Sequence, residues 1–312
     1  MFILSNHKSK ILVISILAIS ISLLGIIFSF LNPDIRAPIR LGIDFKGGSK
    51  IEVTRSCLND SCSDINAEIA EDKILSYFRE KDINGFDASL KQNFNVQLLN
   101  KNTISLKTSY LTPYKSNIYI GLLDDIFGPL DLSKNSVTAI GPKLGVQLLK
   151  KSLIALVLSL IAISLYISIR FDKRFAILAL LALFHDLLIV FGVFSWLGIL
   201  LSVEVNSLFA VSLLTVAGYS VNDTVVIFDR IRENTKLKSN ITYKEIINMS
   251  VSESLSRTIF TSFTTILPLL SLMILGSNSL FLFSLSLFIG IIVGSWSSIC
   301  LAPSLLLNQI KE

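Results

Sequence analysis

The chain has 312 residues, of which 52% are hydrophobic and 16% are charged, and its net charge is +5. A soluble domain carries about a quarter charged residues, so this composition excludes an ordinary soluble enzyme and indicates a protein whose main solvent is lipid. No run rich in Lys and Arg contains interleaved aromatic residues, which argues against a nucleic-acid surface.

The first apolar segment covers residues 11–31 and follows the basic residues Lys8 and Lys10. A membrane-spanning helix needs about 20 mainly apolar residues, and this segment is long enough. The alternative is a cleaved signal peptide. However, the segment exceeds the usual apolar core of about 7–15 residues, and no clear small-x-small cleavage site follows it. We therefore expect an uncleaved membrane anchor.

Residues 32–147 form a polar segment in which strand-like and helix-like stretches alternate. The alternating, β-branched run SKIEVTR at 49–55 predicts a strand, and apolar residues at helical spacing predict a helix over 64–81. Further strands are expected near 85–91, 103–109 and 135–140, and a second helix is expected near 116–127. The βαββαβ order predicts a small α/β domain of the ferredoxin-like type.

The polar segment contains two cysteines, Cys57 and Cys62, on either side of Leu-Asn-Asp-Ser. A local disulfide on the oxidising side of a membrane and two free thiols remain equally open. A metal site would need further ligands, and the only histidines, His7 and His185, lie far away in the sequence. Cys300 lies in an apolar block and is interpreted as a small hydrophobic residue.

Nothing in the polar segment indicates catalysis. It has no histidine and no motif for an activated nucleophile. The run Gly47-Gly48-Ser49-Lys50 lacks the spacing of a Walker phosphate loop, so ATP is not expected to be this chain's energy source. We expect neither an enzyme nor a bound cofactor.

Five further spans follow the polar segment, at residues 152–169, 175–197, 207–228, 258–275 and 280–307. The loops around 198–206 and 276–279 contain no Lys or Arg, whereas the RFDKR turn, residues 230–257 and both chain ends carry the basic residues. The positive-inside rule therefore predicts cytoplasmic termini and an extracytoplasmic polar domain. The predicted organisation is residues 1–31 with the first span, the domain at 32–147, and residues 148–312 with five spans and a cytoplasmic loop at 229–257.

Asp223 is the most informative ionisable residue, because it lies within the predicted fourth span. An ionisable group at membrane depth is costly and is a functional candidate by default. A carboxylate that alternates between a buried site and one beside a cation changes its proton affinity, as a proton carrier requires. A fixed structural pair is the alternative. The neighbouring residues are small or can hydrogen-bond: Ala217, Gly218, Tyr219, Ser220, Asn222 and Thr224.

Arg257, at the start of the fifth predicted span, is the natural counter-charge for Asp223. Arg257, Thr261 and Thr264 share one helix face, which suggests a polar path between helices. A basic anchor that reaches the membrane surface explains Arg257 equally well. His185 and Asp186, in the third span, are adjacent and project about 100° apart. One could pair across the bundle while the other lines the path, and a purely structural bond between spans is nearly as well supported.

The end of the fourth span carries charged residues at helical spacing. Asp229 with Arg232, and Arg230 with Glu233, suit salt bridges within one helix, so a solvated helix end is the simplest interpretation. Residues 243–254 place apolar side chains at helical spacing and suggest an amphipathic helix at the membrane surface before the fifth span.

Four segments, taken together and in this order, resemble the SecF family of bacterial preprotein translocase subunits, within the SecD/SecF group. They are LGIDFKGGS (41–49), the His185-Asp186 pair, GYSVNDTVVIFDRIREN (218–234) and RTIFTSFTT (257–265). The matching motif positions include Gly42, Asp44, Gly47, Gly48, Gly218, Asp229 and Arg230. Cys57 and Cys62 belong to no motif of this family.

The resemblance implies one six-helix half of a resistance-nodulation-division bundle in the bacterial inner membrane. It implies pairing with SecD, association with the SecYEG channel, and use of the protonmotive force on preproteins after the SecA ATPase has acted. The family's proton-coupling carboxylate corresponds to Asp223 and its partner arginine to Arg257. The supporting polar path would contain His185, Asp186, Tyr219, Ser220, Asn222, Thr261 and Thr264.

Two other functions stay open at this point. A small-molecule efflux permease of the same superfamily would need larger external domains than residues 32–147 provide. A scaffold that only stabilises the channel would require Asp223 and Arg257 to be structural.

Overall fold

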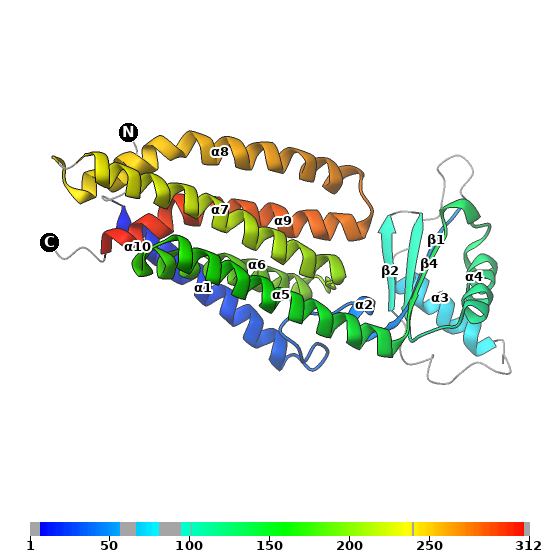
Figure 1. The fold of residues 1–312 in the computed structure, drawn as a ribbon. Helices are drawn as coiled ribbons and strands as arrows, with labels where there is room; N and C mark the ends of the chain where they lie inside the picture. Colours follow the sequence, from blue (N-terminus) through cyan, green and yellow to red (C-terminus); the bar gives the residue numbers. More distant parts are fainter. Residues whose placement is uncertain (1–6, 57–66, 81–94, 101, 239, 309–312) are drawn as a thin grey trace. The chain divides into compact units, whose positions relative to one another are not determined.

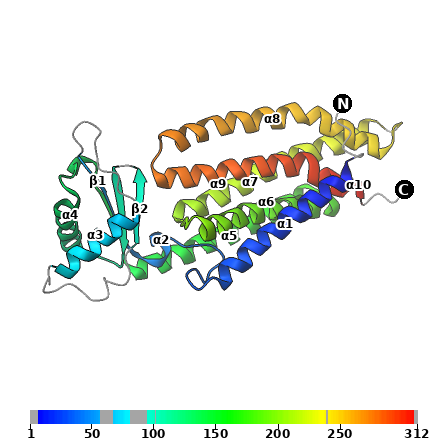
Figure 2. The ribbon, with the colours of Figure 1, turned by 180° about the vertical axis from the view of Figure 1, so that it is seen from behind.

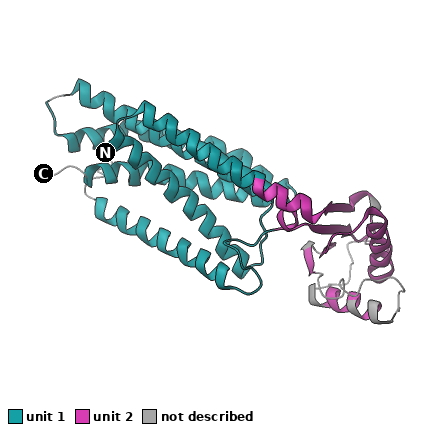
Figure 3. Cartoon of the chain, turned by 60° about the horizontal axis from the view of Figure 1, so that its bottom comes forward, with its two compact units in different colours: residues 1–41, 151–312 teal, residues 42–150 magenta. Residues whose placement is uncertain are grey.

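The computed structural model describes residues 7–56, 67–80, 95–100, 102–238 and 240–308. The chain divides into two compact units, one made of Met1–Leu41 and Lys151–Glu312 and the other of Gly42–Lys150 (Figure 3). The first unit is a helix bundle, and the second contains the β-sheet.

In the described part of the chain, six long helices are apolar enough to cross a membrane, which confirms the predicted number of spans. Figures 1 and 2 show these helices running side by side in the bundle. They are α1 (Lys8–Leu31), α5 (Pro142–Arg170), α6 (Lys173–Leu200), α7 (Ser207–Leu237), α8 (Tyr243–Leu275) and α9 (Asn278–Trp296), the last continued by a π-helical turn (Ser297–Leu301) and α10 (Ala302–Asn308).

The bundle core lies along α6 and α7, which are far more buried than α5 and α8. The outward sides of the other helices are apolar, with exposed residues such as Leu17 and Phe263, as a lipid environment requires. Close packing of α9 on α7 depends on a glycine. A Cβ atom on Gly290 would lie 2.2 Å from Cγ2 of Val216, so only glycine allows this approach.

Three helices extend beyond the predicted spans. α5 begins at Pro142 rather than at 152, and the extension of α7 agrees with the helical charge pairs predicted at residues 229–233. α7 continues past residue 228 to Leu237, and α8 begins at Tyr243 rather than at 258. The expected surface helix at 243–254 is therefore the first part of α8. Its apolar residues Ile247 and Val251 are buried in the same core as Ile231 of α7. This segment is amphipathic because its apolar side packs against a neighbouring helix. A hydropathy pattern cannot distinguish such packing from packing against lipid.

The second unit is a four-stranded antiparallel sheet with the order β2-β3-β1-β4. Its elements are α2 (Ile43–Lys46), β1 (Gly48–Thr54), α3 (Ala67–Glu80), β2 (Asn95–Asn100), β3 (Thr103–Thr108), α4 (Pro113–Phe127), the short helix η4 (Leu132–Lys134) and β4 (Ser136–Ile140). This order of strands and helices confirms the ferredoxin-like prediction.

The sheet core forms where alternate residues of the central strands face the helices. Ile51 of β1 lies opposite Leu106 of β3, and Val53 lies opposite Ile104. All four are buried with residues of α3 and α4, including Ile74 and Leu123. The alternation of buried and outward-facing residues along β1 agrees with the alternating sequence that predicted this strand. The strand predicted at 85–91, together with Cys57 and Cys62, lies outside the described residues, whereas β2 was not predicted.

Candidate functional site

Asp223 lies in α7 with only 4% of its surface exposed. Its Oδ2 atom is buried and has no hydrogen-bond partner among the described residues. A buried charge of this kind is costly unless a cation or a proton compensates it. Arg257 of α8 is near enough to act electrostatically on this carboxylate, but the described side chains make no direct ion pair with each other.

Near Asp223, a series of hydrogen-bonded hydroxyl groups lies at the contact between α7, α8 and α9. One turn before Asp223, the hydroxyl of Tyr219 donates to Oγ of Ser262 at 3.0 Å. The Ser262 hydroxyl lies 2.6 Å from Oγ of Ser295. Ser262 comes from the buried face of α8, which also contains Thr258. Polar groups at this depth therefore join three helices.

A second buried carboxylate, Asp186, is fully hydrogen-bonded. It is 0% exposed. Its Oδ2 accepts hydrogen bonds from Oγ of Ser220 at 2.5 Å and from Oγ of Ser297 at 2.6 Å, and its Oδ1 lies 2.8 Å from Nδ1 of His185. The adjacent His185 and Asp186 thus pair with each other, and Asp186 also joins α6 to α7 and to the end of α9. This environment is that of a structural brace.

His185 contributes a ring that is stacked on Trp296, with ring centroids 6.1 Å apart. Its Nε2 atom is buried and without a hydrogen-bond partner in the described part of the chain.

The π-helical turn at Ser297–Leu301 supplies polar residues that sequence reasoning missed. Oγ of Ser298 lies 2.7 Å from Oγ1 of Thr224, next to Asp223, and also donates to the carbonyl of Ser220 at 3.3 Å. A π-helical turn is frequent at functional sites, and Pro303 just after it lacks the N–H that a regular helix would use. The run of hydroxyls at 295, 297 and 298 in an apolar span was the available signal.

Some predicted site residues face away from this chain's own core. Gly218, Asn222, Arg257, Thr261 and Thr264 are exposed. The hydroxyls of Thr261 and Thr264 bond to carbonyls of their own helix, at 2.9 Å from those of Arg257 and Phe260. The structure therefore places these residues on an outward polar stripe rather than inside the bundle.

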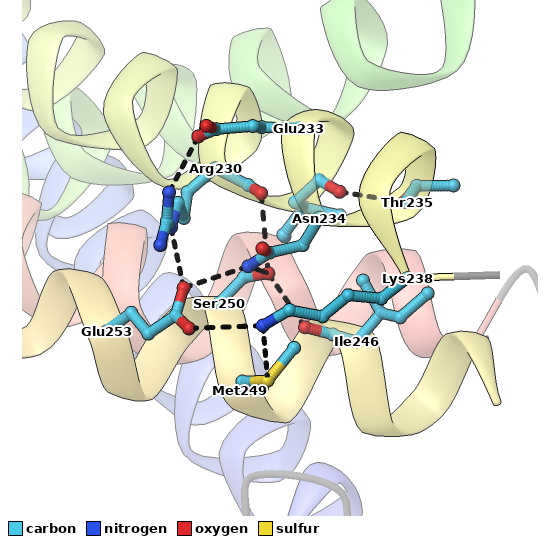
Figure 4. A network of polar contacts seen from close by, with 10 residues as sticks. Arg230, Glu233, Asn234, Thr235, Lys238, Ile246, Met249, Ser250 and Glu253 are labelled. Atoms are coloured by element: carbon cyan, nitrogen blue, oxygen red, sulfur yellow. Dashed lines mark hydrogen bonds and ion pairs between the residues drawn. The ribbon is translucent and has the colours of Figure 1, made fainter. Parts of the chain in front are cut away.

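The charged end of α7 makes two kinds of ion pairs. The expected intrahelical pairs are present, with Arg232 at 2.9 Å from Asp229 and Arg230 at 2.7 Å from Glu233. Interhelical pairs, which were not predicted, join Asp229 to Arg170 of α5 and Arg230 to Glu253 of α8. Figure 4 shows how Arg230 and Asn234 converge on Glu253.

From Gly42 on, the LGIDFKGGS motif lies in the second unit, where it forms α2 and the start of β1. Gly42 caps α2, and Asp44 lies in its first turn. Gly47 and Gly48 have φ angles of 78° and 142°, a region that favours glycine. A Cβ on Gly48 would lie 2.8 Å from the carbonyl oxygen of Thr108. The two glycines therefore have a structural role at the start of the central strand.

The described residues contain no cluster of His, Cys, Asp and Glu that could hold a metal ion. Among the described residues of the bundle, the buried ionisable groups are two carboxylates and one imidazole, which lie among hydroxyl groups. One carboxylate is braced, and the other has an unpartnered oxygen near an arginine.

Comparisons with known proteins agree with the motifs. The family model "Protein export membrane protein SecD/SecF, C-terminal" matches residues 123–312, and "SecD/SecF GG Motif" matches residues 36–57. Protein translocase subunit SecF of Prochlorococcus marinus is 46% identical over 98% of this chain and 94% of its own length. The SecF subunit of Synechocystis is 35% identical over 94% of this chain and 89% of its own.

A solved structure has the same fold. The crystal structure of SecDF, a translocon-associated membrane protein from Thermus thermophilus, superposes with a TM-score of 0.74 at 27% identity. The match covers 99% of this chain and 39% of the SecDF chain, so this chain spans well under half of that protein. A curated SecDF from the same species is 43% identical over 53% of this chain and 22% of its own length.

Proposed function

Because the chain belongs to the SecD/SecF family of protein export membrane proteins, we propose that it couples proton movement at Asp223 to late preprotein transport across the bacterial inner membrane. It is a multi-pass membrane protein and an accessory subunit of the Sec export machinery. Its role is transport rather than catalysis of a covalent reaction.

The observation that carries the proposal is the contrast between the two buried carboxylates. Asp186 receives three hydrogen bonds, whereas Oδ2 of Asp223 receives none among the described residues. A protonated Asp223 is neutral and tolerates burial, and an ionised Asp223 needs the charge of Arg257. Movement of α7 relative to α8 would alternate these two states, which is what a proton-driven device requires.

SecD is the proposed partner, because relatives of this chain occur joined to SecD in one protein, SecDF. The outward polar stripe supports this pairing. Arg257 and Asn222 are exposed on long apolar helices, and a charged or amide side chain facing lipid is unfavourable. A second helix bundle with complementary polar groups would cover them.

The remaining parts of the proposal follow from the family and the distribution of charge. The complex would act with the SecYEG channel and on preproteins after SecA. Both termini would be cytoplasmic, and residues 32–147 would lie outside the membrane, where an emerging polypeptide is handled. Efflux of small molecules is not favoured, because curated relatives along the whole chain are translocase subunits.

The test is preprotein export into inverted membrane vesicles that contain this chain with its matched SecD. The export rate is measured with and without a protonmotive force for Asp223→Asn. We expect the force to lose its stimulating effect while the complex still assembles, because an amide of the same shape cannot bind or release a proton.

Asp172→Asn is the matched control, since Asp172 is exposed at the start of α6 and its side chain makes no capping hydrogen bond. This variant should retain the full stimulation. If Asp223→Asn also retains it in an assembled complex, then Asp223 is structural, and the scaffold function replaces the proton-driven one.

A further inference from the structure

Two sets of polar contacts join α7 to α8, one on each side of Asp223 and Arg257 along the helices. On one side, Tyr219 donates to Ser262. On the other side, Nε of Arg230 donates to Oε2 of Glu253 at 2.6 Å. The two helices run antiparallel, so residue numbers rise along α7 as they fall along α8.

Glu253 is the centre of the second set of contacts, as Figure 4 shows. Its Oε2 also accepts a hydrogen bond from Nδ2 of Asn234 at 2.9 Å, and its Oε1 lies 3.5 Å from Nζ of Lys238. Arg230 and Asn234 occupy successive turns on one face of α7, and Lys238 directly follows the end of this helix. One carboxylate of α8 thus contacts two turns of the neighbouring helix and the residue that follows it.

Asn234 strengthens this contact, because it is only 1% exposed. Its Nδ2 donates both to Glu253 and to Oγ of Ser250 at 2.9 Å. Ser250 is itself fully buried and lies almost one turn before Glu253 on α8. A buried amide that bonds two residues of the facing helix allows one register and disfavours others.

The spacing along both helices connects this contact to the proton-coupling pair. Arg230 lies two turns after Asp223 on the same side of α7, and Arg257 lies one turn after Glu253 on α8. A slip of α8 by one turn would break the contacts of Glu253 and displace Arg257 from Asp223 together. A released Glu253 would also be placed to pair with Arg257 of its own helix, since Glu four residues before a basic residue is the favourable order.

We propose that Glu253 is a positioning residue, which sets the register of α8 on α7 so that Arg257 stands beside Asp223. The inference rests on the proposed proton-coupling function. Glu253 touches neither the proton nor the client polypeptide, and it acts through Arg257. The sequence motif that resembles the family ends at Asn234, so the three partners on α7 lie in or just after it.

The first experiment compares Glu253→Gln with Arg170→Gln in the vesicle export assay. Glu253→Gln removes the interhelical ion pairs of Glu253 with Arg230 and Lys238. Arg170→Gln removes a half-exposed ion pair at the same end of α7, but this pair joins Asp229 to α5 and not to α8. For Glu253→Gln we expect the stimulation by the protonmotive force to fall roughly threefold to tenfold, while the rate without the force stays unchanged. For Arg170→Gln, both rates should stay within about twofold of the unaltered protein.

The second experiment approaches the same contact from α7. Arg230→Gln should reproduce the loss of stimulation, and the double variant with Glu253→Gln should lose less than the sum of the two single losses, because both changes remove the ion pair between Arg230 and Glu253. Assembly with SecD is measured for each variant. If the Glu253→Gln variant does not assemble with SecD, the positioning role is tested by comparing Arg230→Gln with Arg170→Gln.

Two outcomes overturn the positioning role. One is a stimulation by the force that is equal in Glu253→Gln and Arg170→Gln, and the other is fully additive losses in the double variant. Asp223→Asn, measured alongside, separates the two proposals. If it abolishes the stimulation while Glu253→Gln does not reduce it, proton coupling stands and the positioning role fails. If Asp223→Asn retains the stimulation, the proposed function itself fails.

Discussion

Asp186 and Asp223 are buried carboxylates in neighbouring helices, but their surroundings suit opposite tasks. The oxygens of Asp186 are held by two serine hydroxyls and one imidazole. Oδ2 of Asp223 is left without a hydrogen bond among the described residues, within the influence of an arginine that can move with its helix. A well-bonded carboxylate resists change, and a poorly bonded one responds to small displacements. We therefore propose bracing for the first and proton exchange for the second.

The bracing role of Asp186 is testable by removing one of its donors. Ser220→Ala leaves Oδ2 of Asp186 with a single serine donor, Ser297. Loss of a buried hydrogen bond to a charged group costs about 1–3 kcal/mol, so the midpoint of thermal unfolding in detergent should fall.

Ser271→Ala is the matched control for that change, because the Ser271 hydroxyl is exposed and makes only a 3.4 Å contact with its own helix. It should change stability by less than about 0.5 kcal/mol. Equal midpoints for the two variants would show that the bond between Ser220 and Asp186 does not brace the bundle.

The elements that matter for function are longer or less regular than hydropathy indicates. α7 and α8 continue well past the apolar stretches, and their extensions carry the contacts around Glu253. The sixth span is interrupted by a π-helical turn that brings Ser297 and Ser298 towards α6 and α7. Hydropathy reports where lipid surrounds a helix, but helices extend wherever another helix covers them.

The glycine pair before β1 permits a prediction at the scale of one strand. Gly48→Ala places a Cβ 2.8 Å from the carbonyl oxygen of Thr108 at a φ of 142°, so the start of the strand must shift at a cost of about 1–3 kcal/mol. Amide hydrogen exchange of β1 and β3, measured in the full chain in detergent, should become faster.

Gly121→Ala is the control, and it should change stability in the opposite direction from Gly48→Ala. Gly121 lies inside α4, where an added Cβ meets nothing within 4 Å. Replacing a helical glycine by alanine should stabilise the helix by about 0.5–1 kcal/mol and slow its amide exchange. Unchanged exchange in β1 for Gly48→Ala would mean that the motif serves another purpose than shaping this turn.

On the scale of the whole molecule, the bundle carries polar residues on a surface that should face lipid. Asn222 and Arg257 are exposed, as are the apolar residues that surround the rest of the bundle. The polar stripe is consistent with half of a larger helix assembly, whose other half SecD would provide.

This arrangement predicts a position-specific contact with SecD. A photo-crosslinking amino acid at Asn222 should link the chain to SecD in membranes, because the stripe needs a polar partner. The same amino acid at Phe184, which is 66% exposed on apolar α6, should not link to SecD. Equal crosslinking from both positions, or crosslinking from Phe184 alone, would place the SecD interface elsewhere.

The sequence by itself determined the number of spans, the ferredoxin-like order of the small unit, and the identity of Asp223 and Arg257 as candidates. These features depend on local periodicity and on the cost of charge in lipid, both of which are properties of short segments. The sequence also showed the ion pairs within α7, since residues three apart on one helix always meet.

Only the tertiary structure decided which polar groups meet. The partners of Asp186, the three contacts of Glu253 and the outward direction of Thr261 and Thr264 depend on how α6, α7, α8 and α9 are rotated and aligned. Apart from the adjacent His185 and Asp186, each pair joins residues that are distant in sequence, and a one-turn slip would exchange these partners without altering the hydropathy of any segment. Helix alignment is set by close packing of small side chains such as Gly290, which no single-segment pattern records.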